Sequence, residues 1–422
     1  MSALRESAAN LRAFEGPVSK KPDANARKAL FASAVGYAMD GFDLLILGFI
    51  MSAIAAELHL APPQAASLVT ATLIGAVGGG MIFGMLSDYV GRVKVLTWTI
   101  LLFGVFTGLC ALAQGYWDLL AYRTIAGLGL GGEFGIGMAL VAEAWPAHMR
   151  ARVSSYVGLG WQAGVLTAAV VTPALLPSIG WRGMFAVGLV PAVVAVIVRR
   201  TVGEPALFTA RTRPVATPAP RTGGPLRLLA KDWPTTKISL GMFILCAVQN
   251  FGYYGLMIWL PSYLSNSLGY SLTRSALWTA VTVLGMAFGI CLFGQLADRI
   301  GRRPIFFVFQ AGAAIMVVVY AQLTTPTALL IGGAVMGMFV NGMLGGYGAL
   351  MSELYPTAAR ATAQNVLFNL GRAVGGFGPV VVGALATQYS FATAISLLAV
   401  IYLIDIAATA LLIPERKGAE LT

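Results

Sequence analysis

The stretch from Val35 to Ile50, VGYAMDGFDLLILGFI, decides how the rest of the chain is interpreted. It has the apolar character of a membrane-spanning helix, yet it holds two carboxylates, Asp40 and Asp43. A charged residue near the bilayer centre costs about 2.5–3.5 kcal/mol, so it normally faces a cavity or a partner and marks an ion or substrate path. Residues three apart share a helix face, so both carboxylates can point the same way. The alternative is that one of them only pairs with a neighbouring helix.

Composition places the chain among polytopic membrane proteins. Of its 422 residues, 58% are hydrophobic and 11% are charged, whereas soluble proteins carry about 25% charged residues. Apolar runs of about 20 residues, long enough to cross a bilayer, recur along it. The net charge of +11 does not indicate a nucleic-acid partner, because 24 of the 28 Lys and Arg residues fall on connections on one side of the expected topology. This positive-inside pattern predicts that both termini are cytoplasmic, in a plasma membrane of the bacterial inner-membrane type.

Targeting and cysteine usage add little chemistry. The first 28 residues are polar and lack the apolar region of a cleavable signal peptide. Cys110, Cys246 and Cys291 fall in expected spans without metal-ligand spacing, so we expect no disulfide, no metal and no cofactor.

Twelve membrane spans are expected, in two pseudo-symmetric six-helix bundles of an all-α membrane protein. A polar connection rich in Pro, Thr and Arg separates the two halves and should not bury apolar surface. The expected parts are an N-terminal tail (1–29), a first bundle (30–200), a cytoplasmic linker (201–234), a second bundle (235–413) and a C-terminal tail (414–422). The expected spans are 30–55, 65–87, 93–114, 118–143, 152–176, 181–200, 235–265, 273–297, 304–323, 327–354, 361–387 and 390–413.

The two halves repeat with a constant offset of 210 residues. GMLSDYVGR from Gly84 matches GQLADRIGR from Gly294, and EAWPAHMR from Glu143 matches ELYPTAAR from Glu353. Parallel repeats of this kind imply a substrate site between the halves, near the bilayer midplane.

These motifs resemble a known family. The loop G-x-L-x-D-x-x-G-R, present twice, resembles the signature of the major facilitator superfamily, although Tyr89 stands where a basic residue is common. The resemblance implies that the loops act as a latch for one conformation and do not select substrate. The residues expected in the latch are Gly84, Asp88, Gly91, Arg92, Glu143, Arg150, Asp298, Gly301, Arg302, Glu353 and Arg360.

Within the superfamily, Asp40-Gly-Phe-Asp43 is similar to the aromatic-acid and sialate/monocarboxylate proton symporters. The segment around Glu133, GGEFG, is closer to the sialate and metabolite symporters, and Arg123-x-x-x-Gly-x-Gly resembles a motif linked to proton coupling. Glu133 lies ten residues below Arg123, about 15 Å along a helix and near the midplane. We therefore expect Asp40, Asp43, Glu133 and Arg123 to handle the proton. The alternative for Glu133 is a structural pair with an arginine.

Arg372 is the expected anchor for a substrate carboxylate. It lies twelve residues beyond Arg360, about 18 Å along a helix, and a guanidinium group can bind a carboxylate through two hydrogen bonds. A permanent ion pair with Asp40, Asp43 or Glu133 is the alternative. Polar and aromatic residues at comparable depth complete the expected site: Tyr37, Trp161, Gln162, Gln249, Asn250, Tyr253, Tyr254, Asn341, Tyr347, Asn365 and Asn369. Asp405 in the last span has no assigned role.

The sequence thus predicts proton-coupled uptake of a small organic carboxylate by a monomer in a lipid bilayer. An enzyme is a poor reading, because His59 and His148 fall in loops on opposite faces and lack catalytic partners nearby. Export by proton antiport is one alternative, but the fifth span lacks the G-x-x-x-G-P run typical of exchangers. A non-transporting nutrient sensor is another, and the long signalling tail that marks such sensors is not expected after Pro414.

Overall fold

The computed structural model describes residues 24–190, 193, 197, 201–205, 208–209, 224–262, 264, 272–419 and 421. All regular structure in these residues is helical, as the sequence predicts. Residues 1–23 of the expected N-terminal tail and 210–223 of the expected linker lie outside this description. The long helices are α2 (Ala24–Glu57), α3 (Pro62–Val90), α4 (Arg92–Leu109), α5 (Tyr116–Ala144), α6 (Arg150–Val187), α9 (Trp233–Ser262), α10 (Leu272–Ile300), α11 (Arg302–Tyr320), α12 (Pro326–Gly342), α13 (Leu344–Leu354), α14 (Arg360–Gly375), α15 (Gly378–Gln388) and α16 (Phe391–Leu412).

Eleven helical segments of the described chain are long and apolar enough to cross a membrane. One of them, Ala147–Val187, includes the fifth expected span and the start of the sixth. These two are joined at Gly180, whose positive φ of 64° breaks the helical path inside α6. The glycine adopts this conformation at little steric cost. Most of residues 191–200, the end of the sixth expected span, lie outside the described residues.

Two expected spans of the second half are interrupted helices. The tenth divides into α12 and α13 at Met343, where the backbone N–H of Gly346 donates to the Met343 carbonyl at 2.9 Å. The eleventh divides into α14 and α15 next to Pro379, which lacks an N–H and cannot continue the ladder of the preceding turn. The second break lies one to two turns beyond Arg372 and so ends that helix close to the predicted site.

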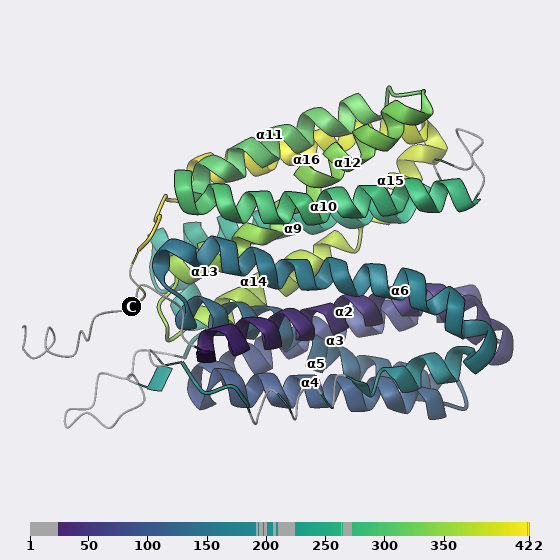
Figure 1. Ribbon diagram of the computed structural model, residues 1–422, viewed down its shortest axis with the longest axis horizontal. Coiled ribbons are helices and arrows are strands. Elements are labelled where there is room, and N and C mark those ends of the chain that lie inside the picture. Colours follow the sequence, from purple (N-terminus) through teal and green to yellow (C-terminus); the bar gives the residue numbers. More distant parts are fainter. Residues whose placement is uncertain are drawn as a thin grey trace, which may run out of the picture.

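The helices form two bundles that face each other (Figure 1). In the first, α2 packs on α6 and α5 packs on α3 and α4; in the second, α10 packs on α12, α11 on α16 and α9 on α14. Figure 1 shows α13 and α14 between the two groups. Contacts between the halves join α6 to α10 and α13, and α14 to α3 and α5.

Close backbone contact fixes the geometry inside each bundle. A Cβ atom at Gly79 of α3 would collide with the Leu128 carbonyl oxygen of α5. The repeat reproduces this contact, since a Cβ atom at Gly289 of α10 would collide with the Met338 carbonyl oxygen of α12. Small residues let the helix backbones approach this closely, and van der Waals packing of this kind holds helices together in a membrane.

Candidate functional site

A small cavity lies where the two halves meet. Its free volume is about 10 Å³, which holds about one water molecule. Apart from Leu344 and Phe368, every lining residue is one that the sequence analysis selects for substrate contact. The lining comprises Tyr37, Trp161, Gln249, Asn250, Tyr253, Tyr254, Asn341, Leu344, Phe368 and Arg372. These lining residues come from six helices of both halves, which meet at this cavity: α2, α6, α9, α12, α13 and α14.

Arg372 enters this cavity between two aromatic rings. Its guanidinium carbon lies 5.3 Å from the centre of the Trp161 ring and 5.2 Å from that of Phe368, distances at which ring faces attract a cation. The side chain is buried, and its Nε and Nη1 atoms have no hydrogen-bond partner among the described residues. The internal ion pair considered for this residue is not formed within the described chain. Arg372 thus presents unused donors to the cavity.

Amide and indole groups order the remainder of the cavity wall. Gln249 donates from Nε2 to Asn341 Oδ1 at 2.6 Å, within the second half. The indole nitrogen of Trp161 donates to the hydroxyl oxygen of Tyr253 at 3.2 Å and links α6 to α9 across the interface. Both halves therefore contribute to the wall through fixed hydrogen bonds.

Asp43 is held by Arg123 in a buried, bidentate ion pair. The Arg123 nitrogens Nη1 and Nη2 donate to the two Asp43 oxygens at 3.0 and 2.8 Å. Thr107 adds a hydrogen bond to Asp43 at 3.3 Å, and Arg123 Nε donates to the Thr72 hydroxyl group at 3.2 Å. Each guanidinium nitrogen of Arg123 is therefore bonded inside the first bundle, and among the described residues Arg123 makes no hydrogen bond to Glu133.

Asp40 and Glu133 form a second, different kind of pair. Both side chains are buried, and none of their four carboxyl oxygens accepts a hydrogen bond from a donor in the described chain. The two carboxyl groups are close enough to interact with each other, and Glu133 packs against Gly36, one helical turn before Asp40. Burying two charges without a cation is very costly, so the arrangement favours a proton on the pair. Asp40 and Asp43 therefore have separate partners, although their spacing allowed both to point the same way.

Four of the predicted site residues lie outside the cavity lining: Gln162, Tyr347, Asn365 and Asn369. Gln162 is buried in α6, and neither atom of its amide group has a partner among the described residues. Asn365 and Asn369 turn toward the backbone of α5, where they bond to Gly135 and Gly131.

Two further buried residues lie in the second bundle. The Tyr347 hydroxyl group donates to the Leu245 carbonyl at 2.9 Å. Asp405 is fully buried near Gln310 and is absent from the cavity lining.

Aromatic rings pack together between the cavity and the end of the molecule that holds the G-x-L-x-D-x-x-G-R loops, here called the latch end. Phe134 of α5 stacks on Phe368 of α14, with ring centres 3.7 Å apart. Tyr37 lies 5.3 Å from both Phe134 and Trp161. Sequence reasoning missed Phe134 and Phe368. In an apolar span, nothing distinguishes a phenylalanine next to a substrate cavity from one in ordinary helix packing.

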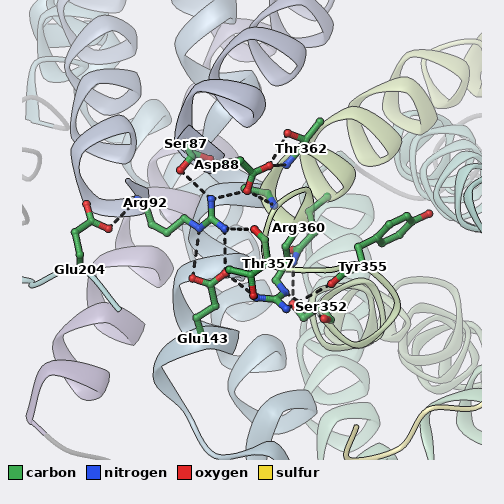
Figure 2. A network of polar contacts seen from close by, with 12 residues as sticks. Ser87, Asp88, Arg92, Glu143, Glu204, Ser352, Tyr355, Thr357, Arg360 and Thr362 are labelled. Carbon is green, nitrogen blue, oxygen red and sulfur yellow. Dashed lines mark hydrogen bonds and ion pairs between the residues drawn. The ribbon is translucent and has the colours of Figure 1, made fainter. Parts of the chain in front are cut away.

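At the latch end, Asp88 and Arg92 connect the first half to the start of α14 (Figure 2). Asp88 Oδ2 accepts hydrogen bonds from the backbone N–H of Thr362 at 2.9 Å and from its hydroxyl group at 2.6 Å. A carboxylate at a helix N-terminus satisfies free N–H groups and complements the helix dipole. Arg92 donates to Asp88 at 2.5 Å and to the Thr357 carbonyl of the other half at 2.8 Å.

Glu143 completes this first latch by binding an arginine from each half. Its Oε1 atom lies 3.0 Å from Arg92 and 2.8 Å from Arg360, and all three side chains are fully buried. Charged groups buried this deeply are stable only when paired. The latch end is therefore closed in this conformation.

The second half repeats the latch at the start of α6. Asp298 accepts hydrogen bonds from the backbone N–H groups of Ala151 and Arg152, both at 3.0 Å. Arg302 binds Glu353 at 2.8 Å, and Glu353 lies 3.7 Å from Arg150. The second latch lacks the hydroxyl bond of Thr362, because Arg152 occupies the corresponding position.

Two glutamates that the sequence analysis did not select hold the ends of the latch loops. Glu204 accepts hydrogen bonds from the backbone N–H groups of Arg92, Val93 and Lys94 at 2.8, 3.0 and 3.1 Å. Glu415 does the same for Arg302 and Arg303 at 3.3 and 2.8 Å. The repeat could have identified them, because each glutamate adjoins a proline and the two are 211 residues apart, close to the 210-residue offset.

Comparisons with known proteins agree with this architecture. The family model described as Major Facilitator Superfamily matches residues 33–287 and 242–421. A protein of Haemophilus influenzae named for metabolite transport is 68% identical over 396 residues, covering 93% of this chain and 97% of that protein. The cis,cis-muconate transport protein of Acinetobacter baylyi is 31% identical, covering 90% of this chain and 92% of its own. The solved structure of the proton:xylose symporter XylE has a TM-score of 0.79 at 19% identity, covering 95% of this chain and 98% of its own.

The fold, the duplicated latch and the family match lead to one conclusion. The sequence resemblance is confirmed, and the family consists of transporters rather than enzymes. The chain belongs to the Major Facilitator Superfamily and is a multi-pass membrane transporter of metabolites.

Proposed function

We propose that this transporter is a proton-coupled symporter that carries a small organic carboxylate into the cytoplasm by alternating access. One observation carries the proposal: Arg372 lines the cavity between the halves, and its Nε and Nη1 donors have no partner among the described residues. A planar guanidinium group with free donors matches a carboxylate in both geometry and charge. The Asp40–Glu133 pair, whose oxygens have no hydrogen-bond partner among the described residues, supplies the place for the proton.

The cavity wall favours an acid with an apolar or unsaturated portion. Aromatic rings of Tyr37, Trp161, Tyr253 and Tyr254 surround Arg372, and the amides of Gln249, Asn250 and Asn341 add a few fixed polar groups. Binding pockets generally combine apolar walls with a small number of placed polar groups. The name of the Acinetobacter relative, a transporter of the dicarboxylate cis,cis-muconate, supports this class of substrate.

Proton and substrate binding should be coupled through charge. A substrate carboxylate at Arg372 adds a negative charge to a cavity lined by Tyr37, which lies three residues before Asp40 on α2. The added charge raises the affinity of the Asp40–Glu133 pair for a proton, and by linkage the bound proton raises the affinity for the carboxylate equally. The transporter that holds both the proton and the carboxylate is therefore favoured over one that holds either alone, as symport requires.

The two latches then set the direction of access. Basic residues gather around them, so we infer that the latch end faces the cytoplasm of a bacterial inner membrane, with both termini on that side. In the conformation described, the latches and the Phe134–Phe368 stack close that side. Both halves of one chain supply the whole cavity, so the monomer is the proposed working unit.

Purified protein in proteoliposomes tests this proposal. A thermal-shift screen of cis,cis-muconate, benzoate, N-acetylneuraminate and lactate first identifies the ligand, because a compound that binds only the folded state raises apparent stability. Uptake of that ligand should then follow an imposed inward proton gradient. Accumulation driven by sodium, or unaffected when the pH gradient is collapsed, would contradict proton symport. Outward-directed exchange against protons would indicate an antiporter, and binding without flux a sensor.

A further inference from the structure

Asn365 and Asn369 of α14 bind the turn of α5 that carries Glu133. The backbone N–H of Gly135 donates to Asn365 Oδ1 at 2.7 Å, and Asn369 Nδ2 donates to the Gly131 carbonyl at 2.8 Å. Gly131 and Gly135 are the acceptor and the donor of one i→i−4 step of the helix. The two asparagines therefore engage both backbone groups of the step that encloses Glu133. We call these two residues the asparagine clamp.

The clamp occupies a buried site. Asn365 is 0% and Asn369 2% exposed, and Asn369 Nδ2 also donates to the Asn365 carbonyl at 2.9 Å. A Cβ atom at Gly80 of α3 would lie 2.6 Å from Asn369 Nδ2, and one at Gly135 would collide with Asn365 Oδ1. Glycines on both neighbouring helices thus leave room for the two amides. Buried polar groups are costly unless they are bonded, so the clamp is stable only while α14 lies against α5.

The repeat shows that the clamp accompanies the acid. In the other half, the position equivalent to Glu133 is Met343, and those equivalent to Asn365 and Asn369 are Ser155 and Leu159. Ser155 donates to the Arg152 carbonyl of its own helix at 2.7 Å and makes no bridge of this kind. Packing of the two interfaces is otherwise similar, since Ser155 lies against Gly345 as Asn365 lies against Gly135. An amide pair is therefore not required for the interface to close.

α14 connects the clamp to both other functional regions. Arg360 and Thr362 of its first turn belong to the latch, and Arg372, three residues beyond Asn369, enters the substrate cavity. Movement of α14 away from α5 would break the latch and the clamp together. The Glu133 turn then loses its two partners while Arg372 changes its position.

We propose that Asn365 and Asn369 are positioning residues that couple the protonation of Glu133 to the movement of the substrate anchor, an inference that rests on the proposed symport. With the latch closed, the clamp holds the Glu133 carboxyl group beside Asp40, where the pair retains a proton. When the latch opens, the clamp separates, the α5 turn loses these two partners, and the acid moves from Asp40. The proton and the carboxylate therefore leave on the same side.

The test measures protons moved per substrate molecule in proteoliposomes. The variants are Asn365→Ala and Asn369→Ala, with Asn369→Ser as a smaller donor if an alanine variant does not fold. Ser155→Ala at the mirror interface is the matched control. Labelled uptake of the preferred carboxylate from the panel above and an internal pH-sensitive dye are read on the same vesicles. We expect the clamp variants to lower the proton-to-substrate ratio about fivefold, in line with the loss of one buried hydrogen bond, while equilibrium exchange of substrate stays near wild type.

Each result is decisive. A clamp variant that transports more slowly at an unchanged proton-to-substrate ratio shows that the asparagines only pack the interface, and it overturns the inference while the symport proposal stands. Wild-type protein that moves substrate without protons, or no carboxylate of the panel at all, overturns the symport proposal and the inference with it. A ratio lowered equally by Ser155→Ala would also contradict the coupling role, because Met343 stands there at the position equivalent to Glu133.

Discussion

Asp88 of the first half accepts both hydrogen bonds that Thr362 of the second half offers at the start of α14, at 2.9 Å from the backbone and 2.6 Å from the hydroxyl group. Thr362→Val removes the hydroxyl group at nearly constant volume. We expect it to favour the latch-open state by about 1–2 kcal/mol, the usual effect of leaving a buried acceptor short of a donor. A cysteine at the buried interface position Ser154, in a background lacking the native cysteines, should then react faster with a water-soluble maleimide. Thr387→Val, on an exposed part of α15, is the control and should leave the rate unchanged.

The substrate anchor is tested by a substitution that keeps the charge. Arg372→Lys loses the planar fork and should weaken carboxylate binding about tenfold or more, even though the positive charge remains. Calorimetric titration measures the dissociation constant. Arg182→Lys, at a partly exposed ion pair with Glu57, is the matched control. Normal substrate binding by Arg372→Lys would exclude a bidentate role.

The acid pair is tested by neutral isosteres. Asp40→Asn and Glu133→Gln mimic the protonated form, so they should abolish proton-driven accumulation and leave binding and exchange of substrate. Gradient-driven uptake and counterflow on the same vesicles separate these effects, and Glu57→Gln at the surface controls for the loss of a carboxylate. This division assigns the proton to the first half and the substrate carboxylate to the second. It is wrong if the acid variants lose substrate binding instead.

Asp43 should behave differently from Asp40, because it is already paired. Asp43→Asn leaves Arg123 buried without its counter-charge, which typically costs about 3–5 kcal/mol. Thermal unfolding in detergent should therefore show a clear loss of stability, whereas Asp40→Asn should leave stability unchanged or raised. Removing both charges with Asp43→Leu and Arg123→Met should recover much of the loss. Equal destabilisation by Asp40→Asn and Asp43→Asn would contradict the distinction.

Orientation is tested outside the described residues. A single cysteine at Thr222, in the linker expected on the cytoplasmic side, should react with an impermeant maleimide only in inside-out vesicles. Labelling in intact cells would reverse the inferred topology and the direction of transport.

Much of the fold and the composition of the site were predictable from sequence. Periodic apolar length predicts the spans, and a fixed offset places Asp88 and Asp298, or Glu143 and Glu353, in equivalent positions. Depth along a helix also places Arg372 correctly in the cavity. Depth does not predict the direction of a side chain, however. Asn365 and Asn369 have the same depth as cavity residues but face the glycines of α3 and α5.

Pairing was equally hidden in the sequence. Asp40 and Asp43 are three residues apart, and only the packing of α5 against α2 gives one of them an arginine and the other a second acid. Three helices are interrupted, at Gly180, Met343 and next to Pro379. The length of an apolar run predicts a membrane span but does not show such interruptions. Glu204 and Glu415 were missed because they lie beyond the apolar runs that the analysis followed.

The contact of Gly79 with the Leu128 carbonyl, and its repeat at Gly289 and Met338, has a mechanical consequence. Where backbone meets backbone, there is no layer of side chains whose rotamers could change to let one helix slide past the other. Shear within a bundle is therefore blocked, and thermal energy or ligand binding can displace each bundle only as a rigid lever. The displacement must then be taken up between the bundles, at the polar contacts that ligands and protons can make or break.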